Sequence, residues 1–279
     1  MAFKVRHARP SDAASIISWT TDTFEWGDYV PDRLTGWIEN DESEVMVCES
    51  ESGEPAAVAH VLMLSSAEAW MEAARVHPDH KRSGMATAMN DHGVEWARGR
   101  GARVVRLATE ADNAAARGQV EALGYRALSQ WVHTSFETAR PSATEELRLK
   151  PSHRSEVDPA WIFWSAGDLA RRGRELLALG WRWRKATPAD LEEAAAAGRL
   201  YQSPSGWAIA EDDDEGCGCG WLAAAPEEGP RLIESLVSLA ASRGQPDLSL
   251  KTPDVAWMTE TLARAGGRPK RILIYAKPV

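Results

Sequence analysis

The sequence predicts an α/β protein in which helices pack on the faces of a mixed β-sheet, with two such domains in tandem. The length of 279 residues exceeds one typical domain and favours two. Runs of alternating apolar residues, typical of strands, are interspersed with apolar stripes at helical spacing. The order of elements at residues 85–136 returns near the C-terminus, which indicates an internal repeat.

The composition is that of a globular protein, with 44% hydrophobic and 26% charged residues. A formal net charge of −9 argues against nonspecific binding to nucleic acid, which requires a basic surface, and mildly favours a cationic substrate. No run approaches the roughly 18 apolar residues of a membrane helix, and no signal peptide is recognisable. We therefore expect a cytoplasmic protein without a membrane partner.

The first half opens with an alternating strand at residues 3–8. The segment Pro10-Ser11-Asp12 then supplies the turn and the cap of a helix. Residues 20–29 are polar and aromatic without a clear period, which predicts a loop over a cleft. A helix and a three-stranded meander follow, at residues 31–38, 44–49, 56–64 and 69–76.

The next helix carries an apolar stripe from Met85 to Trp96 and ends near Gly99. A strand, a helix and one or two further strands complete the first domain, at residues 103–109, 114–123 and 125–136. Residues 138–145 contain Pro141 and several small residues and are the expected linker. We therefore place the two domains at residues 1–142 and 143–279.

The second domain repeats the order helix, strand, helix and strand, at residues 232–241, 248–251, 253–265 and 271–275. Two starting points of this repeat are open. A start at 147–150 gives a unit of full length and is preferred. The segment 184–190 is the alternative, because its residues echo those of the segment 6–12.

A basic, glycine-containing loop lies between the meander and the helix that follows it. It reads Lys81-Arg82-Ser83-Gly84-Met85-Ala86 and is preceded by Val76-His77-Pro78. Such a loop presents unpaired backbone N–H groups and the positive end of a helix dipole, which suit a phosphate. Asn113 and Leu123-Gly124-Tyr125 follow later in the chain. In this order, the segments resemble the conserved motifs of the GNAT acyltransferase superfamily. The family has Gln or Arg at the position of Lys81.

The resemblance covers residues 3 to about 137 and implies an acyl-CoA N-acyltransferase-like (GNAT) fold that uses acetyl-CoA. Backbone N–H groups of the loop would hold the pyrophosphate, and Gly84 would allow a close approach. Asn113 would hydrogen-bond the cofactor arm or only cap its helix. The implied cofactor-binding residues are Val76, His77, Lys81, Arg82, Ser83, Gly84, Met85, Ala86, Thr87 and Asn113.

Acyl transfer to an amine requires the neutral amine, so a general base usually removes its proton. Glu72 is the leading candidate, since its spacing from Val76 predicts that both lie on one face of the strand. The family often uses a Glu on this strand, although nearer Trp70, and a solvated carboxylate is the alternative. Val76 would offer its backbone N–H to the thioester carbonyl, as an oxyanion hole does. Weaker candidates for the base are His77, His80 and Glu110.

Many members of the family use a Tyr seven residues after the Asn as general acid, and Val120 stands at that position here. Either the thiolate leaves unassisted, Tyr125 or Ser129 replaces the acid, or this copy is slow or inactive. The segments Phe24-Glu25-Trp26 and Asp28-Tyr29 lie where the family builds its acceptor pocket. Carboxylates among aromatic rings suit a cationic amine, and an exposed loop is the alternative.

The second domain keeps the architecture but not the loop. Its helix is preceded by Pro226-Glu227-Glu228-Gly229-Pro230, whose carboxylates repel phosphate and whose prolines lack N–H donors. We therefore expect residues 143–279 to be a degenerate GNAT-like copy that binds no coenzyme A. Cys217-Gly218-Cys219 lacks the further ligands of a zinc site, and no metal is expected.

The resulting hypothesis is an N-acetyltransferase that moves the acetyl group of acetyl-CoA to a primary amine of a small molecule or peptide by direct attack. The alternative is a non-catalytic protein that binds coenzyme A as a regulator or scaffold. A third interpretation, a pure interaction module, draws on the tryptophan-rich second half. The acceptor amine, the acyl chain length and the oligomeric state, a homodimer included, stay open.

Overall fold

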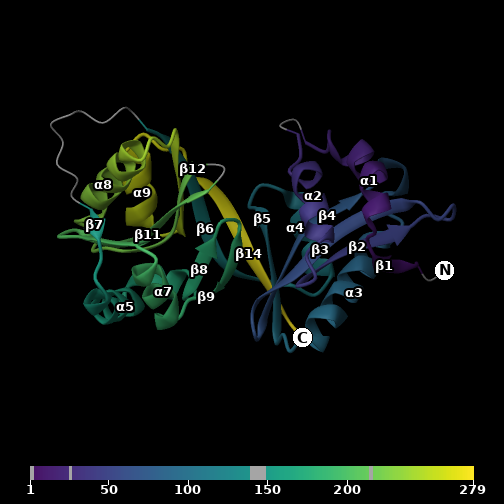
Figure 1. Ribbon diagram of the computed structural model, residues 1–279, viewed down its shortest axis with the longest axis horizontal. Coiled ribbons are helices and arrows are strands. Elements are labelled where there is room, and N and C mark those ends of the chain that lie inside the picture. Colours follow the sequence, from purple (N-terminus) through teal and green to yellow (C-terminus); the bar gives the residue numbers. More distant parts are fainter. Residues whose placement is uncertain (1–2, 25–26, 139–148, 214–215) are drawn as a thin grey trace. The chain divides into compact units, whose positions relative to one another are not determined.

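The computed structural model describes residues 3–24, 27–138, 149–213 and 216–279 (Figure 1). The chain forms two compact units. The first unit comprises residues up to 107 together with 118–126 and 275–279, and the second comprises 108–117 and 127–274. The predicted boundary between residues 142 and 143 and nearly all of the predicted linker lie outside the described residues.

The first unit contains a sheet in which the strand order follows the chain. The first four strands pair with one another in antiparallel fashion, and the fifth is parallel to the fourth. The strands are β1 (Val5–His7), β2 (Ser43–Glu49), β3 (Pro55–Ser65), β4 (Glu68–Val76) and β5 (Val104–Glu110). The helices that accompany them are η1 (Pro10–Asp12), α1 (Ala13–Thr20), α2 (Val30–Ile38), η2 (Pro78–His80), α3 (Met85–Gly99) and α4 (Ala114–Ala122).

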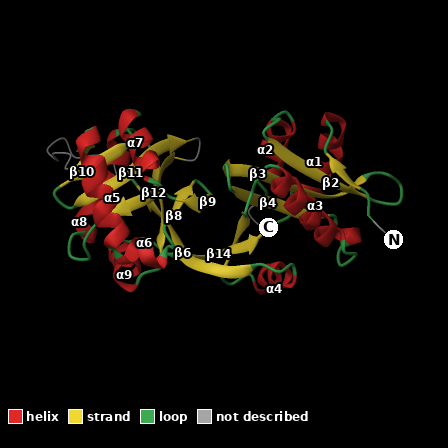
Figure 2. Cartoon of the chain, turned by 90° about the horizontal axis from the view of Figure 1, so that it is seen from below, coloured by secondary structure: helices red, strands yellow, loops and turns green. Residues whose placement is uncertain are grey.

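Helices cover both faces of this sheet, and the alternation along β2 decides which side chains they meet (Figure 2). Val45 and Val47 belong to the core cluster that includes residues of α1 and α2. Met46 lies between these two valines and points to the opposite face, toward α3. A Cβ added to Gly93 of α3 would lie 3.1 Å from Cε of Met46. A glycine at this position therefore lets α3 pack closely on the sheet.

A β-bulge in β4 changes which residues share a face. Val58 pairs with Arg75 and His60 with Glu72, so β4 has one more residue than β3 over this stretch. The extra residue is Ala73, whose φ of 58° lies in the left-handed region. Glu72 and Arg75 thus face α1 and α2 with His60, whereas Val76 faces the other side. The prediction that Glu72 and Val76 share a face is wrong, because simple alternation does not survive a bulge.

The second unit contains a further set of neighbouring strands. Its strands are β7 (Lys150–Pro151), β10 (Leu200–Ser203), β11 (Gly206–Asp213), β12 (Gly216–Ala223), β13 (Asp247–Pro253) and β6 (Arg126–Glu137), in this spatial order. A separate hairpin consists of β8 (Leu176–Leu179) and β9 (Arg182–Lys185). The helices are η3 (Arg154–Glu156), α5 (Val157–Ala166), α6 (Asp168–Arg172), α7 (Pro188–Ala196), α8 (Gly229–Ser242) and α9 (Ala256–Arg264), and β14 (Lys270–Pro278) ends the chain.

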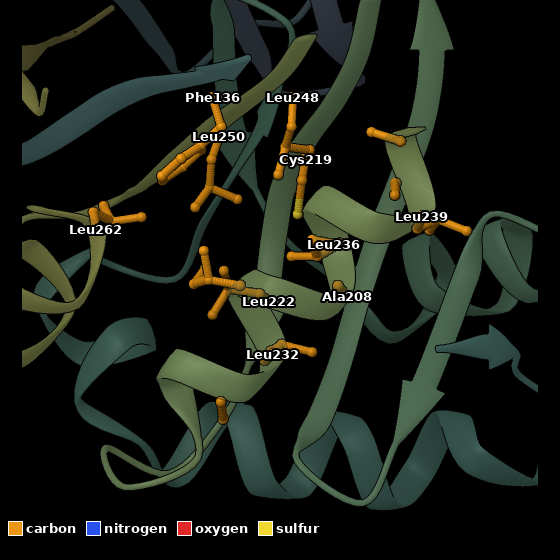
Figure 3. Close-up of a cluster of buried hydrophobic side chains, with 14 of the residues drawn as sticks. Phe136, Ala208, Cys219, Leu222, Leu232, Leu236, Leu239, Leu248, Leu250 and Leu262 are labelled. Atoms are coloured by element: carbon orange, nitrogen blue, oxygen red, sulfur yellow. The ribbon is translucent and has the colours of Figure 1, made fainter. Parts of the chain in front are cut away.

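The core of the second unit lies between its sheet and the helices α8 and α9 (Figure 3). Leu232, Leu236 and Leu239 recur at helical spacing on α8 and are all buried. They meet Leu248 and Leu250 of β13, which lie two residues apart on one face of the strand. Each buried leucine side chain contributes about 1.5–3 kcal/mol relative to an exposed one. A second cluster, with Trp164 and Trp221 among its members, lies under α5 and α7 on the other face.

The strands of the two units neighbour one another in the same order. In the second unit β7, β10, β11 and β12 are antiparallel neighbours and β13 is parallel to β12, as β5 is parallel to β4 in the first. The preferred start of the repeat, at residues 147–150, ends at the first residue of β7. In the strand order of the second unit, β7 occupies the position that β1 has in the first. The alternative start falls at β9 and α7, where Arg184 binds Asp190 with the same spacing as Arg6 and Asp12.

Most predicted elements are present, with shifted ends. Pro253 was expected to start the last helix, but it ends β13, and α9 begins at Ala256. The one or two strands expected at residues 125–136 are a single strand, β6. Among the described residues, no helix is long and apolar enough to span a bilayer.

Candidate active site and cofactor loop

The N-terminus of α3 is an uncapped helix end at the surface. Gly84 is the N-cap, and no side chain caps the helix. The first hydrogen bond of the helix runs from the Ala88 N–H to the Gly84 carbonyl at 3.1 Å. The N–H groups of residues 85–87 therefore have no partner within the helix, and they point toward the loop at residues 81–84, which is exposed. This end can bind an anion, because its N–H groups and its dipole both favour negative charge.

Left-handed backbone shapes this loop. Arg82 has a φ of 62° and Gly84 a φ of 97°, and such conformations turn successive N–H groups inward. A Cβ on Gly84 would also lie 3.3 Å from the Phe3 ring, so a side chain here is both strained and crowded. The Ser83 hydroxyl donates a hydrogen bond to the His80 carbonyl at 2.6 Å, which stabilises the conformation of the loop.

The backbone N–H of Val76 points away from β3. The His77 N–H donates to the Ala56 carbonyl at 2.8 Å, which makes Ala57 and Val76 a pair that does not exchange hydrogen bonds. The Val76 N–H is therefore directed to the opposite edge of β4. The described ladder between β4 and β5 covers only Glu68–Trp70, so it ends well before Val76.

His77 supports the loop rather than facing an open site. Its Nδ1 accepts the Asp79 N–H at 3.2 Å and so caps η2. Its ring meets the Trp19 ring edge-on, with centroids 5.6 Å apart. These contacts fit a structural residue at the strand end, and they offer no geometry for the weaker proposal of His77 as a base.

The carboxylate of Glu72 is held by two ring nitrogens. His60 Nδ1 lies 3.0 Å from Oε1, and Trp70 Nε1 donates to Oε2 at 3.1 Å. The Glu72 side chain is only 12% exposed, so it is not the solvated strand carboxylate considered as the alternative. The nearby Trp70 is thus a partner of this carboxylate.

His60 is a site residue that sequence reasoning missed. It is 1% exposed, and its ring stacks on Trp37 with centroids 4.5 Å apart and planes 14° apart. Its position opposite Glu72 depends on the register of β3 and β4. No sequence signal marks it until that register is known, because a lone histidine in an apolar strand reads as a core residue.

A buried ion pair joins the loop before α2 to β4. Arg75 donates to Asp28 through Nε at 2.7 Å and Nη2 at 3.1 Å, and the Asp28 side chain is fully buried. The Arg75 guanidinium also lies over the rings of Phe24 and Tyr29. Burial raises the pKa of Tyr29 above its ordinary value. Asp28 is therefore committed to Arg75 and not open to a cationic amine; Glu25 and Trp26 lie outside the described residues.

Tyr125 does not suit the role of general acid. It is fully buried, and its hydroxyl donates to Asn90 Oδ1 of α3 at 3.0 Å. Burial, with the nearby Asp91 carboxylate, raises its pKa far above the ordinary value of about 10. We correct the prediction on this ground, because the hydroxyl is used to pack α3 against the strand. Val120 lies on α4 and is half-buried.

Asn113 caps α4, which is the simpler of its two predicted roles. Its Oδ1 accepts the Ala116 N–H at 3.0 Å, the usual capping geometry. The two cysteines of β12 are core residues, and burial raises the pKa of Cys217 to about 11 and of Cys219 to about 12. Both thiols thus stay protonated near neutral pH, a poor state for binding metal. Within the described part of the chain, no three metal-binding side chains come together.

Comparisons with known proteins agree with these features. Residues 12–125 match the family model described as acetyltransferase (GNAT) family. A GCN5-related N-acetyltransferase from Sphaerobacter thermophilus has a similar structure, with a TM-score of 0.65, 18% identity, and 99% of this chain and 96% of that chain covered. A GCN5-related glucosamine N-acetyltransferase region of a fungal multi-domain β-N-acetylglucosaminidase aligns with a TM-score of 0.63 and 14% identity, over 98% of this chain and 38% of the other. At these identities the likeness shows the fold. No curated protein matches the sequence.

Proposed function

We propose that the first unit, whose residues 12–125 match the family model described as acetyltransferase (GNAT) family, transfers an acetyl group from acetyl-CoA to a primary amine by direct attack. The observation that carries the proposal is the open N-terminus of α3. It combines N–H groups without a partner within the helix, left-handed backbone at Arg82 and Gly84, and two basic side chains in one loop. An anion at such a helix end gains about 0.3–1 kcal/mol from the dipole alone, and up to ~2 kcal/mol where it is partly buried.

The residues present fit coenzyme A. The N–H groups of residues 85–87 would hold the pyrophosphate, and Lys81 would add charge from the loop. The backbone N–H of Val76, directed away from β3, would donate to the thioester carbonyl. A donor at this place stabilises the negative charge that develops on the oxygen during attack, an effect worth about 10²–10³ in rate in other enzymes.

Glu72 is the proposed general base. The attacking amine must lose its proton, and Glu72 is an ionisable side chain held in place at the edge of the aromatic cluster that includes Trp37 and Tyr29. The formal charges of Glu72, Asp28 and Arg75 sum to −1. A net negative charge favours the approach of a protonated amine before the base removes its proton.

Departure of the thiolate needs no tyrosine in this proposal. Val120 stands at the usual position of the acid, and Tyr125 is buried against Asn90. An ordinary thiol has a pKa near 8.5, so a thiolate is a tolerable leaving group near neutral pH. We propose that it leaves unassisted and takes a proton from water.

The second unit is proposed to be a degenerate copy without cofactor. At the start of α8, Pro230 lacks an N–H, and the carboxylate of Glu228 accepts hydrogen bonds from Ser205 and Arg231. Residues Gly220–Leu222 of β12 and Lys251–Pro253 of β13, together with Trp131 and Trp164, line a cavity of only about 10 Å³. Small-molecule sites measure roughly 300–1,000 Å³. This copy therefore supports the fold rather than the reaction.

Thiol release from acetyl-CoA tests the proposal. The acceptors would be ethanolamine, tyramine, glucosamine, spermidine and a lysine-containing peptide. We expect amine-dependent thiol release that falls about 10²–10⁴-fold in Glu72→Gln, since a positioned base contributes this much. Coenzyme A binding should persist in this variant. Unchanged turnover in Glu72→Gln would remove Glu72 from the role.

A second function is favoured by one observation, the loss of the usual acid at Val120. A regulator or scaffold that binds coenzyme A without turnover would need the loop of α3 but neither Glu72 nor an acid. It predicts tight cofactor binding and no thiol release above background with any acceptor. The same screen therefore separates the two functions.

A further inference from the structure

Resting on the proposed function, we infer that His60 is a positioning residue that holds the Glu72 carboxylate for proton transfer. The two residues lie directly opposite each other on β3 and β4, and His60 Nδ1 is 3.0 Å from Oε1. Trp70 Nε1 donates to Oε2 at 3.1 Å. Each carboxylate oxygen thus meets a rigid ring nitrogen, and the plane of the carboxylate is fixed from two sides.

We assign the hydrogen between His60 and Glu72 to the histidine. An ionised carboxylate can only accept hydrogen bonds, so the His60 hydrogen on this side lies on Nδ1. Nε2, at the other side of the ring, is buried and has no hydrogen-bond partner among the described residues. Buried polar atoms are usually paired. The hydrogen bond that the described residues give this ring is thus the one through Nδ1 to Glu72.

The His60 ring is itself immobilised. It is 1% exposed and stacks nearly parallel on Trp37 of α2, with ring centroids 4.5 Å apart. The bulge at Ala73 turns Glu72 to this face, so the strand pairing, the stack and the hydrogen bond all act on one carboxylate. Proton transfer needs the base within about 2.6–3.2 Å of its partner, and a displacement of 1 Å can lower a rate about 100-fold.

Two substitutions of His60 separate positioning from simple packing. His60→Leu removes the Nδ1–H donor, whereas His60→Asn keeps an amide N–H near the same place. The other ionisable groups on this face, Tyr29, Asp28 and Arg75, are retained in both variants. The probes are acetyl-CoA and the amine of the panel above that releases thiol fastest.

We expect His60→Leu to lower kcat about 10–100-fold with the KM for acetyl-CoA unchanged. The acidic limb of the pH–rate profile of this variant should move to higher pH, because the ionised carboxylate of Glu72 has lost the hydrogen-bond donor on His60. His60→Asn should recover most of kcat. A variant that only melts at lower temperature, with the wild-type kcat and pH profile, would show that His60 serves packing alone.

A double substitution tests whether His60 acts through Glu72. In a Glu72→Gln background, His60→Leu should have no further effect on kcat. A full additional decrease would overturn the inference. Wild-type kcat in Glu72→Gln alone would instead refute the proposed base, so the two failures differ.

Nitrogen-15 NMR of histidine-labelled protein gives a readout that needs no acceptor. The His60 signal, identified by its absence in His60→Asn, should show the Nδ1–H tautomer and should change in Glu72→Gln. An Nε2–H tautomer, or a signal indifferent to Glu72, would contradict the inference even if no amine of the panel reacts.

Discussion

The helix starts of α3 and α8 follow equivalent strands of two units with the same strand order, yet they are built differently. At α3 the N-cap is the left-handed Gly84, and no side chain satisfies the helix end. At α8 the N-cap is Glu228, with Pro230 in the first turn. Hydrogen bonds from Ser205 and Arg231 hold the Glu228 carboxylate and keep its pKa below the ordinary value. One helix end is open to an anion, and the other carries an anion of its own.

The strands beside these helices also carry different side chains in the two units. In the first unit, β3 and β4 carry the polar network of His60, Trp70 and Glu72. In the second, Trp131, Trp164 and Trp221 line the small cavity beside β12 and β13. In the proposed function the two units share a strand order, but only the first holds a cofactor. The residues proposed to make this difference lie at one helix start and on one strand.

The largest expected effect concerns the tryptophans of the second unit. Trp131 is 1% exposed, so Trp131→Ala should lower the free energy of unfolding by about 3–5 kcal/mol. Coenzyme A affinity, measured below the melting temperature, should not change. Trp181, which is 45% exposed, provides the control, and Trp181→Ala should cost much less. A loss of cofactor affinity in folded Trp131→Ala would show that the second unit takes part in binding.

Arg6–Asp12 in the first unit and Arg184–Asp190 in the second have the same spacing, and they test whether the two pairs contribute equally to stability. Burial raises the pKa of Asp12 and of Asp190, but hydrogen bonds from Arg6 and Arg184 and from backbone N–H groups outweigh it and leave both values below the ordinary one. A lowered folded-state pKa means stability that is present above the unfolded value, about 3.9, and lost as the pH falls through the folded value.

We therefore expect Asp12→Asn and Asp190→Asn each to lower the free energy of unfolding at pH 7 by about 1.5–3 kcal/mol, as for hydrogen bonds between charged groups. Each variant should also lose less stability than the wild type between pH 5 and pH 2, within the range of carboxylate titration. Denaturant unfolding at several pH values measures both effects. Equal pH dependence in variant and wild type would mean that the pair contributes nothing.

The smallest effect should come from the basic side chains of the loop. Lys81 is exposed, so its charge is screened and contributes only about 0.2–1 kcal/mol. Lys81→Ala should weaken coenzyme A binding by no more than about 5-fold, and less at high salt. Arg231→Ala, at the corresponding helix of the second unit, is the control and should have no effect. A larger loss in Lys81→Ala would mean that side chains, rather than the backbone, hold the phosphate.

Local features of this molecule could be predicted from its sequence. The strands, the helices and the loop at residues 81–86 depend on periodicity and on glycine and proline within a few residues. The capping role of Asn113 is local as well, since its partner lies three residues away. These predictions needed no knowledge of how distant segments meet.

The features that were missed depend on contacts between distant segments. The bulge at Ala73 turns Glu72 away from Val76, and it is visible only in the register of β3 and β4. Asp28 is neutralised by Arg75, 47 residues farther along the chain. Tyr125 bonds Asn90 and is lost as an acid for the same reason. Register and burial, not residue type, decided what these side chains can do.

Calorimetric titration of the whole chain with coenzyme A compares the two units most directly. We expect one coenzyme A per chain, abolished by Gly84→Glu, which places a strained and negatively charged side chain at the N-cap of α3. Gly244→Glu is the matched control, because Gly244 also has a positive φ but lies after α8, with nothing within 4 Å of an added Cβ. Two equivalents per chain, or binding that survives Gly84→Glu, would contradict the assignment of a single working loop.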